Sequence, residues 1–226
     1  MRHQAQGLQQ LFSGPAMRTV SVIAGPSAQN SREFVLALAA ELAGEDRRVW
    51  LVETVAGTIS GKLGCRPLLP WRANQPLAQQ VIRTGACGLI HAPGVAAGDA
   101  ALARAAAACR GCDYLVFDGG RFSGGEAPLE PATAQTLVVL LGEGDAEAGY
   151  ALAKALQASH SPARVLLAGD KADGVAQATR HFLKLAVESR QTAGALWQFG
   201  NTRPETSCNT LSFASNLTWV VSRITA

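Results

Sequence analysis

Long apolar runs and basic clusters are both missing from this sequence. Hydrophobic residues fill 48% of its 226 positions, yet no run approaches the roughly eighteen residues of a membrane span, and the first segment does not read as a signal peptide. The formal net charge is +3, and no Lys/Arg cluster concentrates it. This distribution argues against nucleic-acid binding and against a polybasic membrane patch. We therefore expect a cytoplasmic protein that reaches a membrane only indirectly.

Cysteine is scarce, and its spacing indicates no metal site. The five cysteines are an odd number, which suits reduced thiols. Cys109 and Cys112 have the C-x-x-C spacing of a redox pair or half a zinc site, but no second C-x-x-C or His pair is spaced to complete it. No Ser/His/Asp, Cys/His or paired-carboxylate arrangement emerges by spacing either. We expect no metal centre and assign no catalytic residue.

The first part of the chain contains the pattern of a βαβ unit. An apolar run at residues 19–24 is followed by a polar loop at 25–31, a helical pattern at 32–43 and a second apolar run at 49–52. The two strands should be parallel and buried, because a crossover helix covers the sheet. The loop after the first strand is where such folds place an anion, against the free N–H groups of a helix N-terminus.

Further apolar runs predict the remaining strands, with helical patterns between them. Residues 113–118 form an apolar run bracketed by Asp and followed by Gly-Gly, which is typical of a buried strand ending at the carboxyl edge of a parallel sheet. The patterns together predict an α/β fold with a mostly parallel sheet and helices on both faces. The other predicted strands cover residues 88–94, 135–141, 163–168 and 196–199, the helices 100–110, 145–158 and 174–188, and a last core segment 217–224.

The loop after the first strand departs from a phosphate-binding loop. Such a loop reads G-x-x-x-x-G-K-[ST], where glycines expose N–H groups, the Lys reaches the phosphates and a hydroxyl holds Mg²⁺. The eight residues from Gly25 are GPSAQNSR, which keep only the first glycine. Asn30 occupies the second glycine position, Ser31 the Lys position and Arg32 the hydroxyl position. The loop therefore lacks the main charge contact to phosphates.

Two other residues invite a phosphate or metal interpretation. Asp118 ends a predicted strand, and we expect its carboxylate to accept hydrogen bonds from the turn that follows rather than to serve a metal. Lys62 follows a serine and a glycine, but no strand precedes it and the first glycine is missing. We interpret Lys62 as a solvated side chain on a helix face.

The strand, loop, helix and following LVE segment resemble the MinD/ParA class of deviant P-loop ATPases. Their loop is similar to KGGxGKT and their second strand ends in Asp-x-Asp. In that comparison Pro26 falls on the additional family lysine, Ser27 and Ala28 on the paired glycines, Glu53 on the first Asp and Val55 on the second. Pro26 supplies neither a cation nor an N–H, and Val55 cannot orient a water.

The resemblance implies a P-loop NTPase fold of MinD type with a degenerate nucleotide site. In the family the Asp that matches Asp118 holds a water of the Mg²⁺ ion, and an Asn after a later strand recognises adenine, where this chain has Gly169-Asp170-Lys171. We expect no cofactor, with ATP and Mg²⁺ as the alternative. The degenerate site would comprise Gly25, Ser27, Asn30, Ser31, Arg32, Glu53 and Asp118.

A short amphipathic pattern at residues 1–12 precedes the α/β domain. Ser13-Gly14-Pro15 separates the two, so we predict a docking helix and linker at 1–16 and a domain at 17–226. A helix similar to DQAxxLR ahead of a MinD-like domain is the arrangement of the flagellar-number regulators FlhG, FleN or YlxH. This chain keeps the Gln-Ala core and the Leu, whereas His3 replaces the acidic residue and Gln9 the Arg. The resemblance implies that Gln4, Ala5, Leu8 and Gln9 bind a partner protein.

Three functions remain open at this point. The first is a non-catalytic MinD-like regulator of flagellar placement, number or assembly that contacts an FlhF-type GTPase of the signal-recognition-particle class. The second is an ATPase with an unorthodox loop, in which Arg32 supplies the charge and Ser27 or Ser31 the hydroxyl. The third is a pseudo-ATPase scaffold that localises a pilus or polysaccharide secretion machine. In the first, partners would recruit the protein to the cell pole or inner membrane surface, and a homodimer remains open.

Overall fold

The computed structural model describes residues 17–29, 31–44, 46–65, 69–85, 87–122, 136–159, 163–191 and 207–226. The predicted docking helix and linker at 1–16 and the predicted strand at 196–199 therefore lie outside the described residues. None of the helices within these ranges is long and apolar enough to cross a membrane.

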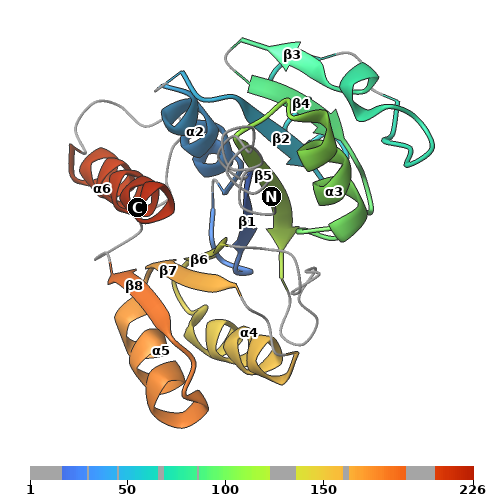
Figure 1. The fold of residues 1–226 in the computed structure, drawn as a ribbon. Helices are drawn as coiled ribbons and strands as arrows, with labels where there is room; N and C mark the ends of the chain where they lie inside the picture. The colour runs from blue at the N-terminus through green and yellow to red at the C-terminus, as the bar shows by residue number, and fades with distance from the viewer. Residues whose placement is uncertain are drawn as a thin grey trace, which may run out of the picture.

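The described residues form one eight-stranded sheet in the order β3-β4-β2-β5-β1-β6-β7-β8 (Figure 1). All neighbouring strands are parallel except β3 and β4, which pair antiparallel at one edge. This arrangement confirms the predicted α/β fold with a mostly parallel sheet. The strands are β1 (Arg18–Ala24), β2 (Val49–Glu53), β3 (Ile82–Thr84), β4 (Cys87–His91), β5 (Tyr114–Arg121), β6 (Thr136–Leu141), β7 (Arg164–Gly169) and β8 (Val187–Gln191).

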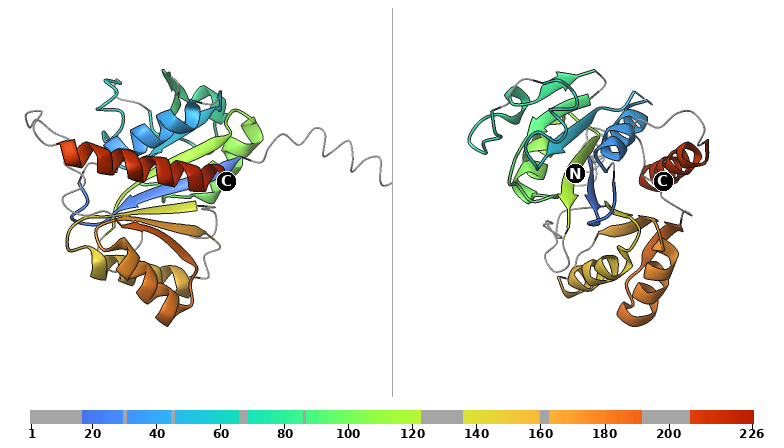
Figure 2. Two further views of the ribbon diagram at one scale, coloured as in Figure 1. Left: turned by 90° about the vertical axis from the view of Figure 1, so that its left-hand side faces the viewer. Right: turned by 180° about the vertical axis from the view of Figure 1, so that it is seen from behind.

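Helices cover both faces of the sheet (Figures 1 and 2). One face packs against α2 (Ser31–Ala43) and α6 (Ser207–Thr225), whose apolar side chains join those of the central strands in one core cluster. The other face packs against α3 (Ala100–Cys109), α4 (Ala146–Ala158) and α5 (Ala172–Ala178). Strand β1 alternates between the two, with Val20 and Val22 in the first core and Ile23 in the second, as the two-residue period of a strand requires.

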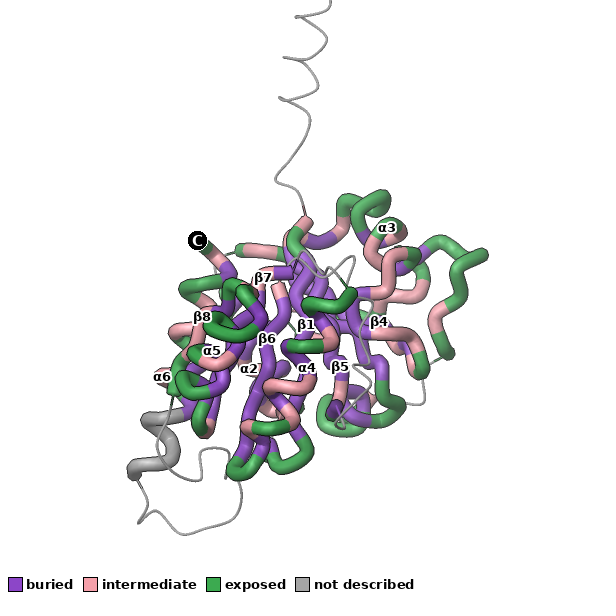
Figure 3. The backbone as a smooth tube through the Cα atoms, turned by 90° about the horizontal axis from the view of Figure 1, so that it is seen from below, coloured by how far each residue is buried: buried purple, intermediate pink, exposed green. Residues whose placement is uncertain are grey.

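Strand β1 lies at the centre of the sheet between β5 and β6 (Figure 3, where the central strands are largely buried). The loop after β1 therefore emerges between the carboxyl ends of two parallel neighbours. In open α/β sheets ligands bind outside these ends, so the fold places the 25–31 loop where a ligand would lie.

The last helix belongs to the core. In α6 the side chains of Phe213, Leu217, Val220 and Ile224 are buried against the α2 face of the sheet, and the Phe213 ring meets the edge of Phe34 with centroids 6.0 Å apart. This packing confirms the prediction that residues 217–224 form a core segment.

Two local predictions were wrong, and two short elements were not predicted. The helix predicted over 174–188 ends earlier, because α5 continues as the π-helix η2 (Thr179–Leu183) and Lys184 then adopts a left-handed φ of 54°. The chain next forms β8, which the helical periodicity had hidden. Residues 61–64 form turns, so Lys62 does not lie on a helix. The 3-10 helix η1 (Leu77–Gln79) and the edge strand β3 were not predicted, since each is only three residues long.

Candidate functional site

The loop after β1 uses its first N–H groups within the chain. Gly25 N donates to Leu140 O at 2.8 Å and thereby extends the contact of β1 with β6. Pro26 has no N–H. Ser27 N donates to the Asp145 carboxylate at 3.0 Å (Oδ1) and 3.2 Å (Oδ2), and Ala28 N donates to Gly25 O at 3.1 Å. The N–H groups of residues 25, 27 and 28 are thus already paired.

Asp145 supplies the carboxylate that lies against this loop. It immediately precedes α4 but makes no capping bond to that helix, and its Oδ2 instead accepts from Gly142 N at 2.8 Å as well as from Ser27 N. Its exposed fraction is only 3%. A Cβ added to Gly25 would lie 2.1 Å from Asp145 Oδ2, so the glycine is what allows this approach. The loop is held by an anion that belongs to the chain itself.

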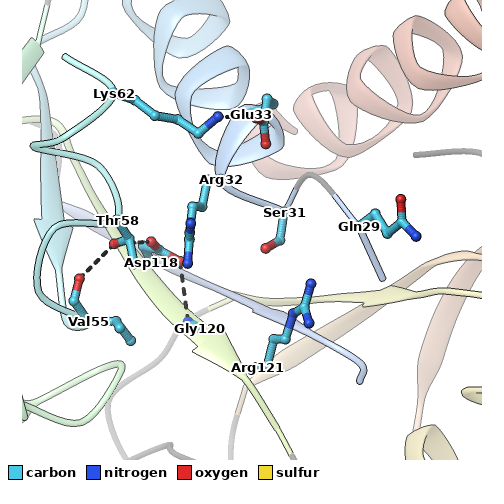
Figure 4. Close-up of a pocket in the computed structure, with 10 residues that line it drawn as sticks. All are labelled: Gln29, Ser31, Arg32, Glu33, Val55, Thr58, Lys62, Asp118, Gly120 and Arg121. Carbon is cyan, nitrogen blue, oxygen red and sulfur yellow. Dashed lines mark hydrogen bonds and ion pairs between the residues drawn. The ribbon is translucent and has the colours of Figure 1, made fainter. Parts of the chain in front are cut away.

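A cavity of about 520 Å³ opens beside the loop, between the start of α2 and the carboxyl ends of β2 and β5 (Figure 4). It brings together Ser31, Arg32 and Asp118 from the predicted site. Gly25, Ser27 and Glu53 do not line it, and Asn30, Gln4, Ala5, Leu8 and Gln9 lie outside the described residues. The other lining residues were not predicted as part of the site, and they are Gln29, Glu33, Val55, Thr58, Lys62, Gly120 and Arg121.

Three basic side chains border the cavity. Arg32 extends from the first turn of α2, and Arg121 extends from the end of β5 and donates to Ala28 O at 3.4 Å. Lys62 forms an ion pair with Glu33, and the Glu33 carboxylate compensates the Lys62 charge. Among the described residues, no carboxylate forms an ion pair with Arg121 or Arg32.

Asp118 is the buried carboxylate of the cavity, with 2% of its surface exposed. It accepts hydrogen bonds from Thr58 Oγ1 at 3.0 Å and from Gly120 N at 3.3 Å. The backbone donor lies within β5, which continues to Arg121, and not in a turn after Asp118 as the sequence predicted. Burial raises the pKa of the Asp118 carboxyl above its ordinary value, although the Thr58 hydroxyl, the Gly120 N–H and the nearby Arg32 charge oppose the shift.

Glu53 serves the neighbouring segment rather than the cavity. Its fully buried Oε1 accepts from Ile59 N at 2.7 Å, Ser60 N at 2.9 Å and Ser60 Oγ at 3.0 Å, while Oε2 lies 2.6 Å from His91 Nδ1. Burial acts to raise the pKa of Glu53, but the hydrogen bonds from Ser60, His91 and Ile59 together hold it below its ordinary value. Glu53 therefore holds the 58–60 segment in place, and Thr58 of this segment lines the cavity.

The C-x-x-C pair is not arranged for redox chemistry. Cys112 is buried, and its burial raises the pKa of its thiol to about 12. Little thiolate exists at neutral pH in such a group, and the thiolate is the reactive form. Within the part of the chain that the structure describes, no three His, Cys, Asp or Glu side chains gather to hold a metal ion.

Comparisons with known proteins identify the fold. No family model and no curated protein matches the sequence. Among solved structures, a ParA family ATPase from Chlorobium tepidum has a TM-score of 0.57 at 13% identity, covering 94% of this chain and 99% of that one. Cobyrinic acid a,c-diamide synthase from Mycobacterium smegmatis, with bound ADP and magnesium, has a TM-score of 0.58 at 18% identity over 93% and 96% of the two chains.

A third similar structure is a chain of the MinC:MinD cell division protein complex of Aquifex aeolicus, with a TM-score of 0.51 at 11% identity over 75% of this chain and 79% of that one. The chain therefore has the fold of the MinD and ParA type of P-loop ATPases. At these identities the likeness extends to the fold alone.

The residues present do not fit a magnesium triphosphate seated on the loop. Ser31 brings no cation to the phosphates, and the Ser27 and Ala28 N–H groups are paired within the chain. The position where a hydroxyl would hold Mg²⁺ is occupied by Arg32, whose positive charge acts on Asp118. A divalent cation at that place would meet a guanidinium instead of an oxygen ligand.

Proposed function

We propose that this protein is a non-catalytic regulator that keeps a MinD-type fold as a platform and acts by contact with a protein partner. The observation that supports this most directly is the hydrogen bond from the Ser27 N–H to the Asp145 carboxylate. A loop N–H is thereby paired with a carboxylate of the chain itself. The replacement of the phosphate-binding Lys by Ser31 supports it from the sequence.

The partner we propose is an FlhF-type GTPase of the signal-recognition-particle class, and the process is flagellar placement, number or assembly. Residues 1–12 carry the contact, with Gln4 at the partner's catalytic site and Ala5 and Leu8 as apolar anchors. Gln9 belongs to the same proposed contact. The MinC:MinD complex of Aquifex aeolicus is a precedent for a protein of this fold that assembles with another protein.

The test is the GTPase rate of the cognate FlhF-type protein. We expect the full chain to increase that rate, and we expect deletion of residues 1–12 or the substitution Gln4→Ala to remove the increase. Gln10→Ala in the same segment is the matched control and should retain it. Equal rates with the full and the shortened chain would contradict the proposal.

A second candidate is an ATPase with an unorthodox loop. The cavity favours it, since Arg32 and Arg121 offer cationic charge beside the Ser31 hydroxyl. Calorimetric titration with ATP and Mg²⁺ separates the candidates. A Mg²⁺-dependent affinity tighter than the order of tens of micromolar, about −6 kcal/mol, would favour the ATPase.

A further inference from the structure

We propose that the cavity beside the loop binds a phosphate chain without a divalent cation, with the guanidinium groups of Arg32 and Arg121 in place of the metal. This inference deepens the proposed function, because it names a ligand class for the site that the MinD-type fold retains. The ligand is an anion with two or more linked phosphoryl groups, either inorganic or part of a nucleotide.

The cavity is lined by more basic than acidic side chains. Its lining holds three basic side chains, Arg32, Lys62 and Arg121, and two acidic ones, Glu33 and Asp118. Lys62 and Glu33 pair with each other, and Asp118 accepts hydrogen bonds from Thr58 and Gly120 and lies near the Arg32 charge. Arg121 has only the 3.4 Å contact with Ala28 O among the described residues. Within the described part of the chain, most of the five guanidinium donors of Arg121 are therefore available for a ligand.

The hydrogen-bond donors of the cavity come from two different elements. In Figure 4 the Ser31 hydroxyl is drawn between the guanidinium groups of Arg32 and Arg121, which reach the cavity from α2 and from β5. Guanidinium groups bind phosphate oxygens through paired N–H donors and remain charged at every physiological pH. Because the two groups come from separate elements, a chain of linked phosphates can offer one phosphoryl group to each.

The residues of the loop do not suit a bound magnesium ion. A triphosphate normally needs a divalent cation to neutralise its charge and a hydroxyl to hold that cation. Here a guanidinium occupies the position of the hydroxyl, so the cationic charge is built into the chain. The cavity volume of about 520 Å³ lies within the range of small-molecule sites.

The experiment is calorimetric titration of the full chain with sodium pyrophosphate, once in EDTA and once in excess Mg²⁺. We expect binding in EDTA and no gain in affinity from Mg²⁺. We expect Arg121→Gln to weaken binding by about 10-fold or more, since it removes charge-assisted hydrogen bonds. Arg121→Lys should restore part of the loss, and Arg83→Gln, an exposed arginine on β3, should bind as the unmodified chain does.

The outcomes are distinct from those of the GTPase test. Absence of binding in EDTA, a requirement for Mg²⁺, or unchanged affinity in a folded Arg121→Gln variant would overturn the inference, and intact GTPase stimulation would then leave the proposed function standing. Binding without GTPase stimulation would overturn only the proposed function. If pyrophosphate binds, equal affinity for tripolyphosphate and ATP assigns recognition to the phosphate chain, and tighter ATP binding assigns it to a nucleotide.

Discussion

The Asp145 carboxylate accepts the Ser27 N–H at 3.0 Å and 3.2 Å, and it joins residues 118 positions apart in the sequence. The same carboxylate accepts the Gly142 N–H at 2.8 Å. One side chain thus fixes the loop after β1 to the turn after β6. The contact holds the loop through a carboxylate of the chain itself.

We expect Asp145→Ala to lower the free energy of unfolding by about 2 kcal/mol, because two backbone donors lose their acceptor. Urea unfolding at pH 7 measures the change. Glu143→Ala, at an exposed position of the same turn, is the control and should change stability by less than about 0.5 kcal/mol. Equal effects of the two substitutions would show that the carboxylate does not hold the loop.

We expect Gly25→Ala to destabilise the protein by about 1–3 kcal/mol, since the new methyl group would overlap Asp145 Oδ2. In the Asp145→Ala background the same substitution should cost less, because the atom it overlaps is gone. A double-mutant cycle in urea measures this coupling. Additive costs would mean that the two residues are not in contact.

The stabilising effect of Glu53 should depend on pH. Because its pKa is held below the ordinary value of 4.5 in the folded protein, its contribution is complete above that value and is lost as the pH falls through the lower folded value. We expect Glu53→Gln to cost about 2 kcal/mol at pH 7 and progressively less below pH 4.5. Asp118, whose pKa is raised mainly by burial, acts in the opposite sense in both proteins, and the Glu53 charge is a smaller cause of its shift. Unfolding free energies of the unmodified chain and Glu53→Gln across this pH range measure the difference. A difference that does not change with pH would contradict this role of Glu53.

The two cysteines of the C-x-x-C pair should differ in reactivity. Cys109 is exposed, whereas burial raises the pKa of the Cys112 thiol to about 12. Brief iodoacetamide treatment of the native protein at pH 8, followed by peptide mass spectrometry, should show modification of Cys109 but not of Cys112. Urea should make both thiols react. Comparable labelling in the native state would contradict the burial of Cys112.

Two buried serines should respond in opposite directions to substitution by Ala. The Ser21 hydroxyl is buried on β1 with no hydrogen-bond partner among the residues that the structure describes, and the Ser60 hydroxyl donates to Glu53 at 3.0 Å. We expect Ser21→Ala to raise the free energy of unfolding by about 1 kcal/mol and Ser60→Ala to lower it by a similar amount. Thermal unfolding of both variants decides this. A loss of stability in Ser21→Ala would mean that its hydroxyl is satisfied.

The fold was predictable from the sequence because its signals are local. Buried parallel strands appear as short apolar runs, and the central strands β1, β5, β6 and β7 were located within one or two residues, apart from the far end of β5. The edge strand β3 has no such run, since Ile82 and Arg83 are exposed. The break at Lys184 depends on one backbone angle that periodicity does not show.

The site was predictable only where a motif position identified it. Ser31, Arg32 and Asp118 follow from the phosphate-loop pattern and from a strand end. Asp145 and Arg121 do not, because sheet pairing of β1 with β6 and β5 brings them to the loop from distant parts of the chain. No local pattern distinguishes them from an ordinary helix start or a strand-end arginine.

The most direct test of the central claim is ATP turnover by the full chain under single-turnover conditions with Mg²⁺. We predict no Mg²⁺-dependent release of phosphate above the rate of the buffer, and no difference between the unmodified chain and Asp118→Asn. Mg²⁺-dependent release that Asp118→Asn abolishes would show that the site catalyses hydrolysis and would contradict the account.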